Sequence, residues 1–588
     1  MTDSQIDRQV SPVAEERRKK FIESDAGDGT TREEQYLSGA KLILCIFSIF
    51  FCLFLFALDQ TIVATLLTEV GNKFNAFDRI GWLTSGFLIS MAALVAVWGK
   101  LSLIFGRKST MIVAIVLFEA GSLMCALADN MDVLIGGRVL AGVGGGGIQT
   151  MTFIIITEIL PIQKRPLGMA LLGCVFAVAS VLGPLIGGAF TSHVSWRWCF
   201  YINLPVGGAA GVLFIYCFNP PKTKGNWKEK ILMIDYIGVV LMTAGFVVLL
   251  MALTLASGNE YEWDSGAVIA CFVVGGVTFI AFCVWNFIYS KHPLLPWEVV
   301  KVIQVSAAAF SMFGTFAYFM AGVLYISIYF QVVHNASAWE SGVHLLPMII
   351  STVITSIASG ILIKKTRHIK PFAILGAAMG MVGCGIITLL DVDSSNANKI
   401  GLLIPLGIGV GFQMQSSILG AQVAAPKSPG STIMATTLVN VCRTFGGALA
   451  GALADAVYSA ALTNHMKKTL PEQGSEVAKE LSGVNLESLI TSTTLLGDLS
   501  PSARAYVKSE VMNAIRDTFY MALGFSAIAM IFTVFQTNRR LPDVDLAENQ
   551  QEIKEKDAPE VSEESSKEHS DEASGSGEVD EEIRSQRS

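Results

Sequence analysis

The chain contains fourteen apolar segments that follow one another between residues 42 and 537. A helix of about 20 residues crosses the hydrocarbon core of a bilayer. Within that core, helices satisfy every backbone hydrogen bond internally. We therefore predict an all-α polytopic membrane protein. The spans are expected near residues 42–67, 80–99, 109–128, 133–156, 168–190, 198–218, 233–256, 265–289, 303–330, 341–363, 371–390, 400–425, 432–460 and 517–537.

Composition supports this class and excludes several others. Only 15 % of the residues are charged, whereas soluble domains carry about 25 %. The net charge of −7 is misleading, because the last 48 residues hold 16 acidic and five basic side chains and leave the body mildly basic. This distribution gives no support for a nucleic-acid partner. The ten cysteines have no paired spacing and indicate neither disulfides nor a metal site.

No GxxxxGK[ST] sequence occurs, so nothing indicates ATP as an energy source. An ion gradient or a passive pore remains, and we expect no bound cofactor.

The basic residues predict the orientation, because cytoplasmic connections of membrane proteins are enriched in Lys and Arg. Alternate connections, counted from the N-terminus, carry most of the basic residues, whereas the opposite short connections carry only a few. Both termini are therefore expected in the cytoplasm. Residues 1–41 and the acidic residues 541–588 are expected to be disordered tails, and residues 461–516 a long external loop.

The fourth span contains the sequence RVLAGVGGGG, which begins at Arg138 and ends at Gly147. An ionised side chain at bilayer depth is unfavourable by roughly 2.5 kcal/mol or more, so it usually marks a function and needs a partner. Asp59 in the first span is the candidate partner, and we expect the two charges to line a polar path between helical bundles. Residues 142–147 formally match GxGxxG, but no strand precedes them, which excludes a dinucleotide site.

Two further glycine-containing sequences lie at span boundaries or within spans. In GKLSLIFGRK (residues 99–108), Gly99 and Gly106 permit a tight turn, while Arg107 and Lys108 suit a cytoplasmic connection.

In GPLIGG of the fifth span, Pro184 removes a helical hydrogen bond and introduces a kink. Gly183, Gly187 and Gly188 allow close helix packing.

These sequences, with LDQTIVATLL (residues 58–67) and WRWCFYINLPVG (residues 196–207), resemble the motifs of the major facilitator superfamily. The last two are similar to the fourteen-span drug:proton antiporter branch, in particular to fungal multidrug exporters of the crystal-violet and azole or weak-acid resistance kind. The resemblance covers about residues 42–540.

The resemblance implies the major facilitator fold, with six-helix bundles at residues 42–218 and 303–540 and two inserted spans within residues 219–302. It also implies alternating access and a role in proton transfer for Arg138 and Asp59. For GPLIGG (residues 183–188), called the fifth-span motif below, the resemblance implies that it lets the helix bend and seals the closed interface between the bundles. Residues 99–108 correspond to the family's loop motif, whose usual aspartate helps to lock the bundles together on the cytoplasmic side. Leu103 stands in place of this aspartate, so the lock is either weakened or supplied by another residue.

Other polar residues in the spans are candidates for the transport path. Asp59 and Arg138 could alternatively serve only to hold helices together. Glu119, midway along the third span, is a possible proton carrier. Arg443 and Asp455 of the thirteenth span are expected either to face the cavity or to pair with each other. The glutamines predicted to line the cavity are Gln149, Gln331, Gln413, Gln415 and Gln422.

We therefore expect a proton-coupled antiporter, not an enzyme, that exports amphipathic or cationic drugs. Its partners are expected to be small-molecule substrates, protons and membrane lipid, and the protein is expected to be monomeric, in the plasma membrane or alternatively the vacuolar membrane. The rival functions are a vacuolar basic amino acid transporter of the same superfamily and a non-transporting membrane sensor.

Overall fold

The computed structural model describes residues 27, 36–74, 76, 79–221, 223, 226–257, 263–336, 338–470, 477, 481 and 499–541. Nearly all of the two predicted tails lies outside these residues.

Fourteen helical segments of the described chain are long and apolar enough to cross a membrane, which confirms the predicted all-α fold. The helices of these segments are α2 (Gly39–Ile62), α4 (Gly81–Phe105), α5 (Arg107–Ala126), α6 (Met131–Ile159), α7 (Arg165–His193), α8 (Trp198–Tyr201) with α9 (Asn203–Cys217), α11 (Tyr236–Ser257), α12 (Gly266–Val284), α14 (Ile303–Ile328), α15 (Ala338–Thr366), α16 (Lys370–Ile387), α17 (Asn396–Gly401) with α18 (Ile404–Ala424), α19 (Ser431–Thr469) and α23 (Pro501–Val534).

Short elements connect or extend the spans. They are η2 (Val63–Thr65), α3 (Leu67–Phe74), α10 (Trp227–Leu232), α13 (Trp297–Val300) and the two π-helical segments η4 (Trp285–Tyr289) and η5 (Tyr329–Val333).

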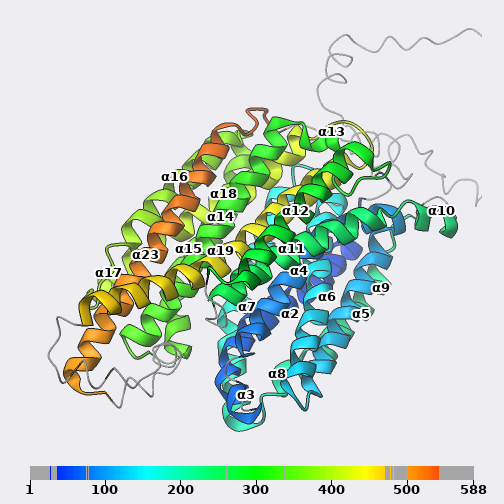
Figure 1. Cartoon of the computed structure of the whole chain (residues 1–588). Coiled ribbons are helices and arrows are strands. Elements are labelled where there is room, and N and C mark those ends of the chain that lie inside the picture. Colours follow the sequence, from blue (N-terminus) through cyan, green and yellow to red (C-terminus); the bar gives the residue numbers. More distant parts are fainter. Residues whose placement is uncertain are drawn as a thin grey trace, which may run out of the picture. The chain divides into compact units, whose positions relative to one another are not determined.

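Twelve of the fourteen spans pack into two bundles of six helices each, and their course can be followed in Figure 1. The N-terminal bundle consists of α2, α4, α5, α6, α7 and α9, and the C-terminal bundle of α14, α15, α16, α18, α19 and α23. The bundles meet along two seams, where α4 packs on α19 and α7 packs on α15.

The inserted helices α11 and α12 pack on each other, and α11 covers the seam between α4 and α19. Phe246 of α11 stacks on Phe445 of α19 at a centroid distance of 4.5 Å. Leu250 and Leu253 of α11 pack in one apolar cluster with Ile89 and Ala92 of α4. Few residues of α12 are buried, whereas α6 is buried almost throughout.

Because successive spans run in opposite directions, the connections rich in Lys and Arg lie at one end of the bundles, which we call the basic end. Figure 1 shows α10 and α13 at this end and α3, α8 and α17 at the opposite end. Gly106, with φ +88°, forms the one-residue turn between α4 and α5 at the basic end. A side chain other than glycine is strained at such a φ.

Helix α6 approaches α5 and α4 closely because its interfaces are built from glycines. A methyl group at Gly144 would lie 2.6 Å from the carbonyl oxygen of Ala114 on α5. One at Gly142 would collide with Ser90 and Phe87 of α4. Small residues allow such backbone contacts between membrane helices, which are stabilised by dispersion because lipid is as apolar as the side chains.

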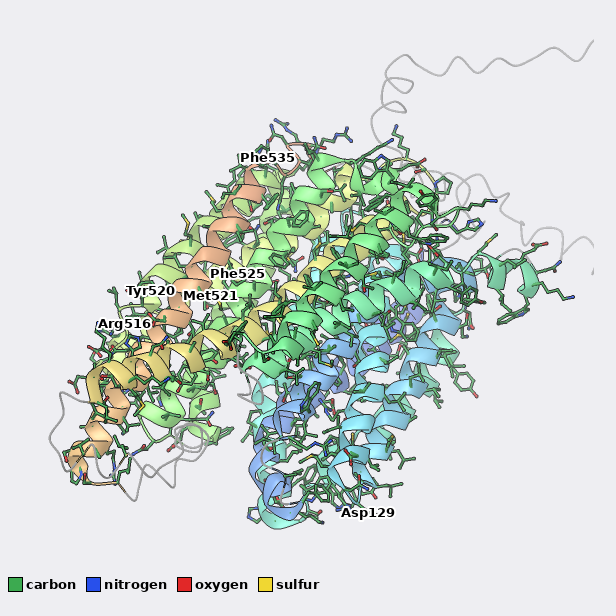
Figure 2. The ribbon with its side chains drawn as sticks, in the orientation of Figure 1. Asp129, Arg516, Tyr520, Met521, Phe525 and Phe535 are labelled. Carbon is green, nitrogen blue, oxygen red and sulfur yellow. The ribbon has the colours of Figure 1, made fainter. Side chains whose placement is uncertain are left out.

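The predicted external loop 461–516 is shorter than expected, because both flanking helices continue into it. Helix α19 extends to Thr469 and α23 begins at Pro501, where Ser500 caps the helix by accepting from the Ala503 backbone N–H at 3.3 Å. The side chains of Val507 and Val511 are buried against the C-terminal bundle. Figure 2 shows Arg516, Tyr520 and Phe525 in succession along α23, and Phe535 directly after the helix ends.

We predict that Gly144→Ala lowers the thermal stability of the detergent-purified protein, because the methyl group forces α6 away from α5. Overpacking of this kind costs about 1–3 kcal/mol. The control is Gly385→Ala on α16, where an added methyl group has no atom within 4 Å. The melting temperature measured by intrinsic fluorescence should fall for Gly144→Ala only. Equal melting temperatures would contradict the close packing.

Candidate functional site

Asp59 of α2 and Arg138 of α6 form an ion pair, with 2.5 Å between Asp59 Oδ2 and an Arg138 terminal nitrogen. The structure therefore brings together the two charges predicted to be partners. Their side chains are 0 % and 2 % exposed, respectively. Water does not screen a pair at this depth, so its geometry fixes α2 against α6.

The remaining polar atoms of this pair are also occupied. Arg138 Nε donates to the carbonyl oxygen of Leu83 at 3.0 Å, and the guanidinium lies 4.3 Å from the ring centroid of Phe87. Asn203 Nδ2 of α9 donates to Asp59 Oδ1 at 3.3 Å and to Ser122 Oγ at 3.0 Å. The network thus links five helices of the N-terminal bundle.

The location of the pair differs from the prediction. Asp59 and Arg138 lie inside the N-terminal bundle, not on a path between the two bundles. The physical reason is that α4 and α9 supply polar groups that complete the pair within the bundle.

Glu119 of α5 lies close to this network but has no partner in the described chain. Both carboxylate oxygens are buried and neither has a hydrogen-bond donor there. The carboxylate lies against Gly207 of α9, where an added methyl group would collide with it. An ionised carboxylate in such surroundings is strongly unfavourable, which distinguishes Glu119 from the paired Asp59.

The loop motif fixes the basic end of the N-terminal bundle. Arg107 of α5 forms a buried ion pair with Glu158 of α6, with Nε 2.7 Å from Oε2. Lys108 donates to the carbonyl oxygen of Ile215 at 2.6 Å and to Asn219 Oδ1 at 2.5 Å, which ties α5 to the end of α9.

Hydrogen bonds between the two bundles gather in the half of the protein nearer the basic end. Gln422 of α18 donates from Nε2 to Thr157 of α6 at 3.1 Å and to Thr436 of α19 at 3.2 Å. Its Oε1 accepts from Arg165 at the start of α7, at 3.5 Å. All four side chains are at most 2 % exposed, so this junction is closed.

The glycine and leucine of the loop motif lie at the same junction. A methyl group at Gly99 would collide with Thr437 of α19, so the two helices are in close contact there. Leu103 lies beside Gly430, the residue before α19, where a methyl group added to Gly430 would be 3.5 Å from Leu103. The position of the usual aspartate therefore makes an apolar contact, and Gln422 supplies the polar link.

The fifth-span motif joins α7 to both bundles. Methyl groups at Gly183 and Gly187 would collide with Thr61 and Thr65, which places these glycines against α2 and its 3-10 extension. Pro184 lies inside α7 near Gly342 of α15. No atom lies within 4 Å of a methyl group at Gly188.

The other predicted glutamines divide between the interface and the interior. Gln149 of α6 accepts from Thr444 of α19 at 3.5 Å across the bundles. Gln415 donates to Ser356 of α15 at 2.9 Å. Gln413 donates to Thr533 of α23 at 2.7 Å and to Ser311, and is fully buried inside the C-terminal bundle. Gln331 in η5 donates to Ser327 at 2.9 Å, also within that bundle.

The predicted pairing of Arg443 with Asp455 is wrong. Asp455 accepts a hydrogen bond from the Tyr325 hydroxyl at 2.8 Å and is exposed. Arg443 is buried, with its guanidinium between the rings of Phe153 and Phe316. The two residues are twelve positions apart on one helix, which corresponds to about 18 Å at 1.5 Å per residue.

Sequence reasoning missed Asn203, Glu158 and Arg165 as members of these networks. Glu158 is an acid near the end of an apolar span, and Asn203 is a polar residue within WRWCFYINLPVG. The rule that an intramembrane polar residue needs a partner applies to all of them.

No cluster of His, Cys, Asp and Glu suited to a metal ion occurs among the described residues. Two helical bundles with buried ionisable groups and a closed junction at one end define a membrane transporter. Residues 49–451 match the family description Major Facilitator Superfamily, and the chain belongs to this family. It is therefore a multi-pass transporter of small molecules and not an enzyme.

Among its relatives is Azole resistance protein 1 of Saccharomyces cerevisiae, which is 37 % identical, with 88 % of this chain and 91 % of the relative covered. Vacuolar basic amino acid transporter 5 of the same organism is 34 % identical, with 88 % and 94 % covered. The solved structure of the proton:xylose symporter XylE has a TM-score of 0.54 at 12 % identity, with 87 % of this chain and 99 % of that chain covered. This last likeness concerns the fold alone.

We predict that Gln422→Leu loosens the junction at the basic end, because leucine has a similar size but makes none of the three hydrogen bonds. A single cysteine at position 444, in a background without the ten native cysteines, serves as the reporter. A membrane-impermeant maleimide should label it several-fold faster in the Gln422→Leu variant. The matched control is Gln331→Leu in η5, the segment that follows α14 at the end opposite the basic end. Equal labelling rates in the two variants would contradict a role for Gln422 in closure.

Proposed function

We propose that this protein is a proton-coupled antiporter that exports amphipathic organic compounds, cationic drugs among them. The observation that carries the proposal is the buried pair of Asp59 and Arg138, whose only carboxylate can take up or release a proton. Export is supported by the relative named for azole resistance.

Protonation of Asp59 would remove the charge that holds Arg138. The guanidinium would keep its bond to the Leu83 carbonyl and its contact with Phe87. The link from α2 to α6 and α9 would weaken, because Asn203 and Arg138 donate more strongly to an ionised carboxylate than to a neutral one. Such a local charge change biases a bistable pair of bundles.

Glu119 is proposed as a second proton carrier. Its buried oxygens have no donor in the described chain, and a bound proton removes the cost of the unpaired charge. If Asp59 and Glu119 were both ionised, the same bundle would hold two buried negative charges, which is unfavourable. A proton on Glu119 therefore favours the ion pair between Asp59 and Arg138.

The junction around Gln422 is proposed as the gate at the basic end. By the positive-inside rule this end faces the cytoplasm, and both termini lie there. Gly99 and the fifth-span motif provide the close helix contacts that let the junction seal and open. The Arg107–Glu158 pair and Lys108 keep α5, α6 and α9 together as one rigid unit during this motion. We propose a monomer in the plasma membrane.

The second candidate is transport of basic amino acids across the vacuolar membrane, which the similarity to Vacuolar basic amino acid transporter 5 favours. Uptake of lysine by vesicles containing only this protein, in competition with a cationic dye, distinguishes the two. Lysine uptake that the dye does not inhibit would favour the amino acid transporter.

We predict that Asp59→Asn slows export of rhodamine 6G driven by a pH gradient by more than tenfold in reconstituted vesicles. An amide cannot exchange the proton. Exchange of dye between the two sides without a gradient should continue, which separates coupling from misfolding.

The matched control is Asp129→Asn at the connection between α5 and α6, labelled in Figure 2, because this carboxylate is 91 % exposed and pairs only at the surface with Arg197. Gradient-driven export at the unmodified rate by Asp59→Asn would remove Asp59 from the coupling mechanism.

A further inference from the structure

Arg443 is the buried arginine whose charge has the weakest compensation in the described chain. Its side chain lies in the middle of α19 and is 1 % exposed. None of its three guanidinium nitrogens has a hydrogen-bond partner among the described residues. Arg107 and Arg138, which are buried to the same extent, each have a carboxylate, and Arg165 donates to the Leu160 carbonyl.

Two aromatic rings hold the Arg443 guanidinium. Its central carbon lies 4.7 Å from the ring centroid of Phe153 on α6 and 4.6 Å from that of Phe316 on α14. Cation–π contacts attract the guanidinium to the two rings but use none of its N–H donors. Because no described residue accepts a hydrogen bond from the three nitrogens, these donors are available to an anion.

The rings come from different bundles, because α6 belongs to the N-terminal and α14 to the C-terminal bundle. If the junction at the basic end opens as proposed above, α6 separates from α19 and Phe153 moves away from Arg443. The guanidinium would then keep its contact with Phe316 and face the space between the bundles.

Asn440 adds a second polar group on the same helix face. It is 1 % exposed, and neither its amide nitrogen nor its oxygen has a hydrogen-bond partner in the described chain. Residues three positions apart on a helix are neighbours, so Asn440 and Arg443 share one face of α19. Thr444 and Gln149, which bond to each other across the interface, are next to the same position.

We propose that Arg443 and Asn440 form the anion-binding part of the substrate site. They would take an amphipathic organic anion, such as a carboxylate attached to an aromatic or apolar body. This inference rests on the proposed export function and names a substrate class for it.

A guanidinium fork binds a carboxylate through two parallel hydrogen bonds, and Phe316 contacts the apolar body of the substrate. When the junction closes, Phe153 returns to the guanidinium and competes with the substrate. Closure of the junction therefore favours release of the substrate toward the end opposite the basic end.

The test compares two dyes of similar size in vesicles reconstituted with the full-length protein: fluorescein, which carries a carboxylate, and the cation rhodamine 6G. Arg443→Gln should lower kcat/KM for fluorescein at least tenfold and change that for rhodamine 6G less than twofold. Arg443→Lys, which keeps the charge but not the planar fork, should retain an intermediate rate for fluorescein. The control Arg540→Gln removes the same charge from the exposed surface at the basic end and should affect neither dye.

Asn440→Asp is the second variant and protects the test against misfolding of Arg443→Gln. It keeps the arginine but gives it an internal carboxylate, so fluorescein transport should fall at least tenfold while rhodamine 6G transport continues. Equal effects on the two dyes in Asn440→Asp would overturn the anion site.

Transport of rhodamine 6G but not fluorescein by the unmodified protein would also overturn the anion site, and would leave the export function intact. Transport of neither dye under a pH gradient would instead contradict the proposed function itself.

Discussion

The hydrocarbon core of a bilayer offers no hydrogen bonds, so each ionised side chain within the spans depends on what the protein places around it. The buried arginines show how differently this requirement is met. Arg107 and Arg138 have carboxylates and Arg165 has a carbonyl and an amide oxygen, whereas Arg443 has two aromatic rings and no hydrogen-bond partner among the described residues. An arginine whose charge is balanced by a carboxylate serves as a fixed structural link. An arginine whose charge is balanced only in part can still bind a ligand.

Both bundles use the same means to bring helices together. Glycines on α6 let backbones of α4 and α5 approach, and glycines on α18 do the same with α15 and α16. The interface between the bundles instead contains the hydrogen bonds of Gln422, including the one from the charged Arg165, together with the hydrogen bond of Gln149 and the contact of Leu103 with Gly430. Separation of these contacts would let each bundle move as a unit, as the proposed alternating access requires.

The fold and the class of protein could be predicted from the sequence, because span length and apolar composition leave few alternatives. The partnership of Asp59 with Arg138 could also be predicted, since two opposite charges in spans require each other. Their place inside one bundle could not, because hydropathy does not determine how a helix is rotated about its axis. Gln413 and Gln422 illustrate the same limit: both are amides on α18, but one faces the interior of its bundle and the other the junction.

The cover that α11 forms over α4 and α19 has a consequence for how a cargo molecule reaches the transporter. Phe246, Leu250 and Leu253 pack on side chains of both helices at this seam. A compound dissolved in the bilayer would therefore meet α11 on this flank before it reached α4 or α19. Because the inserted pair covers this seam, the surface that the protein presents to lipid differs from one flank to the other.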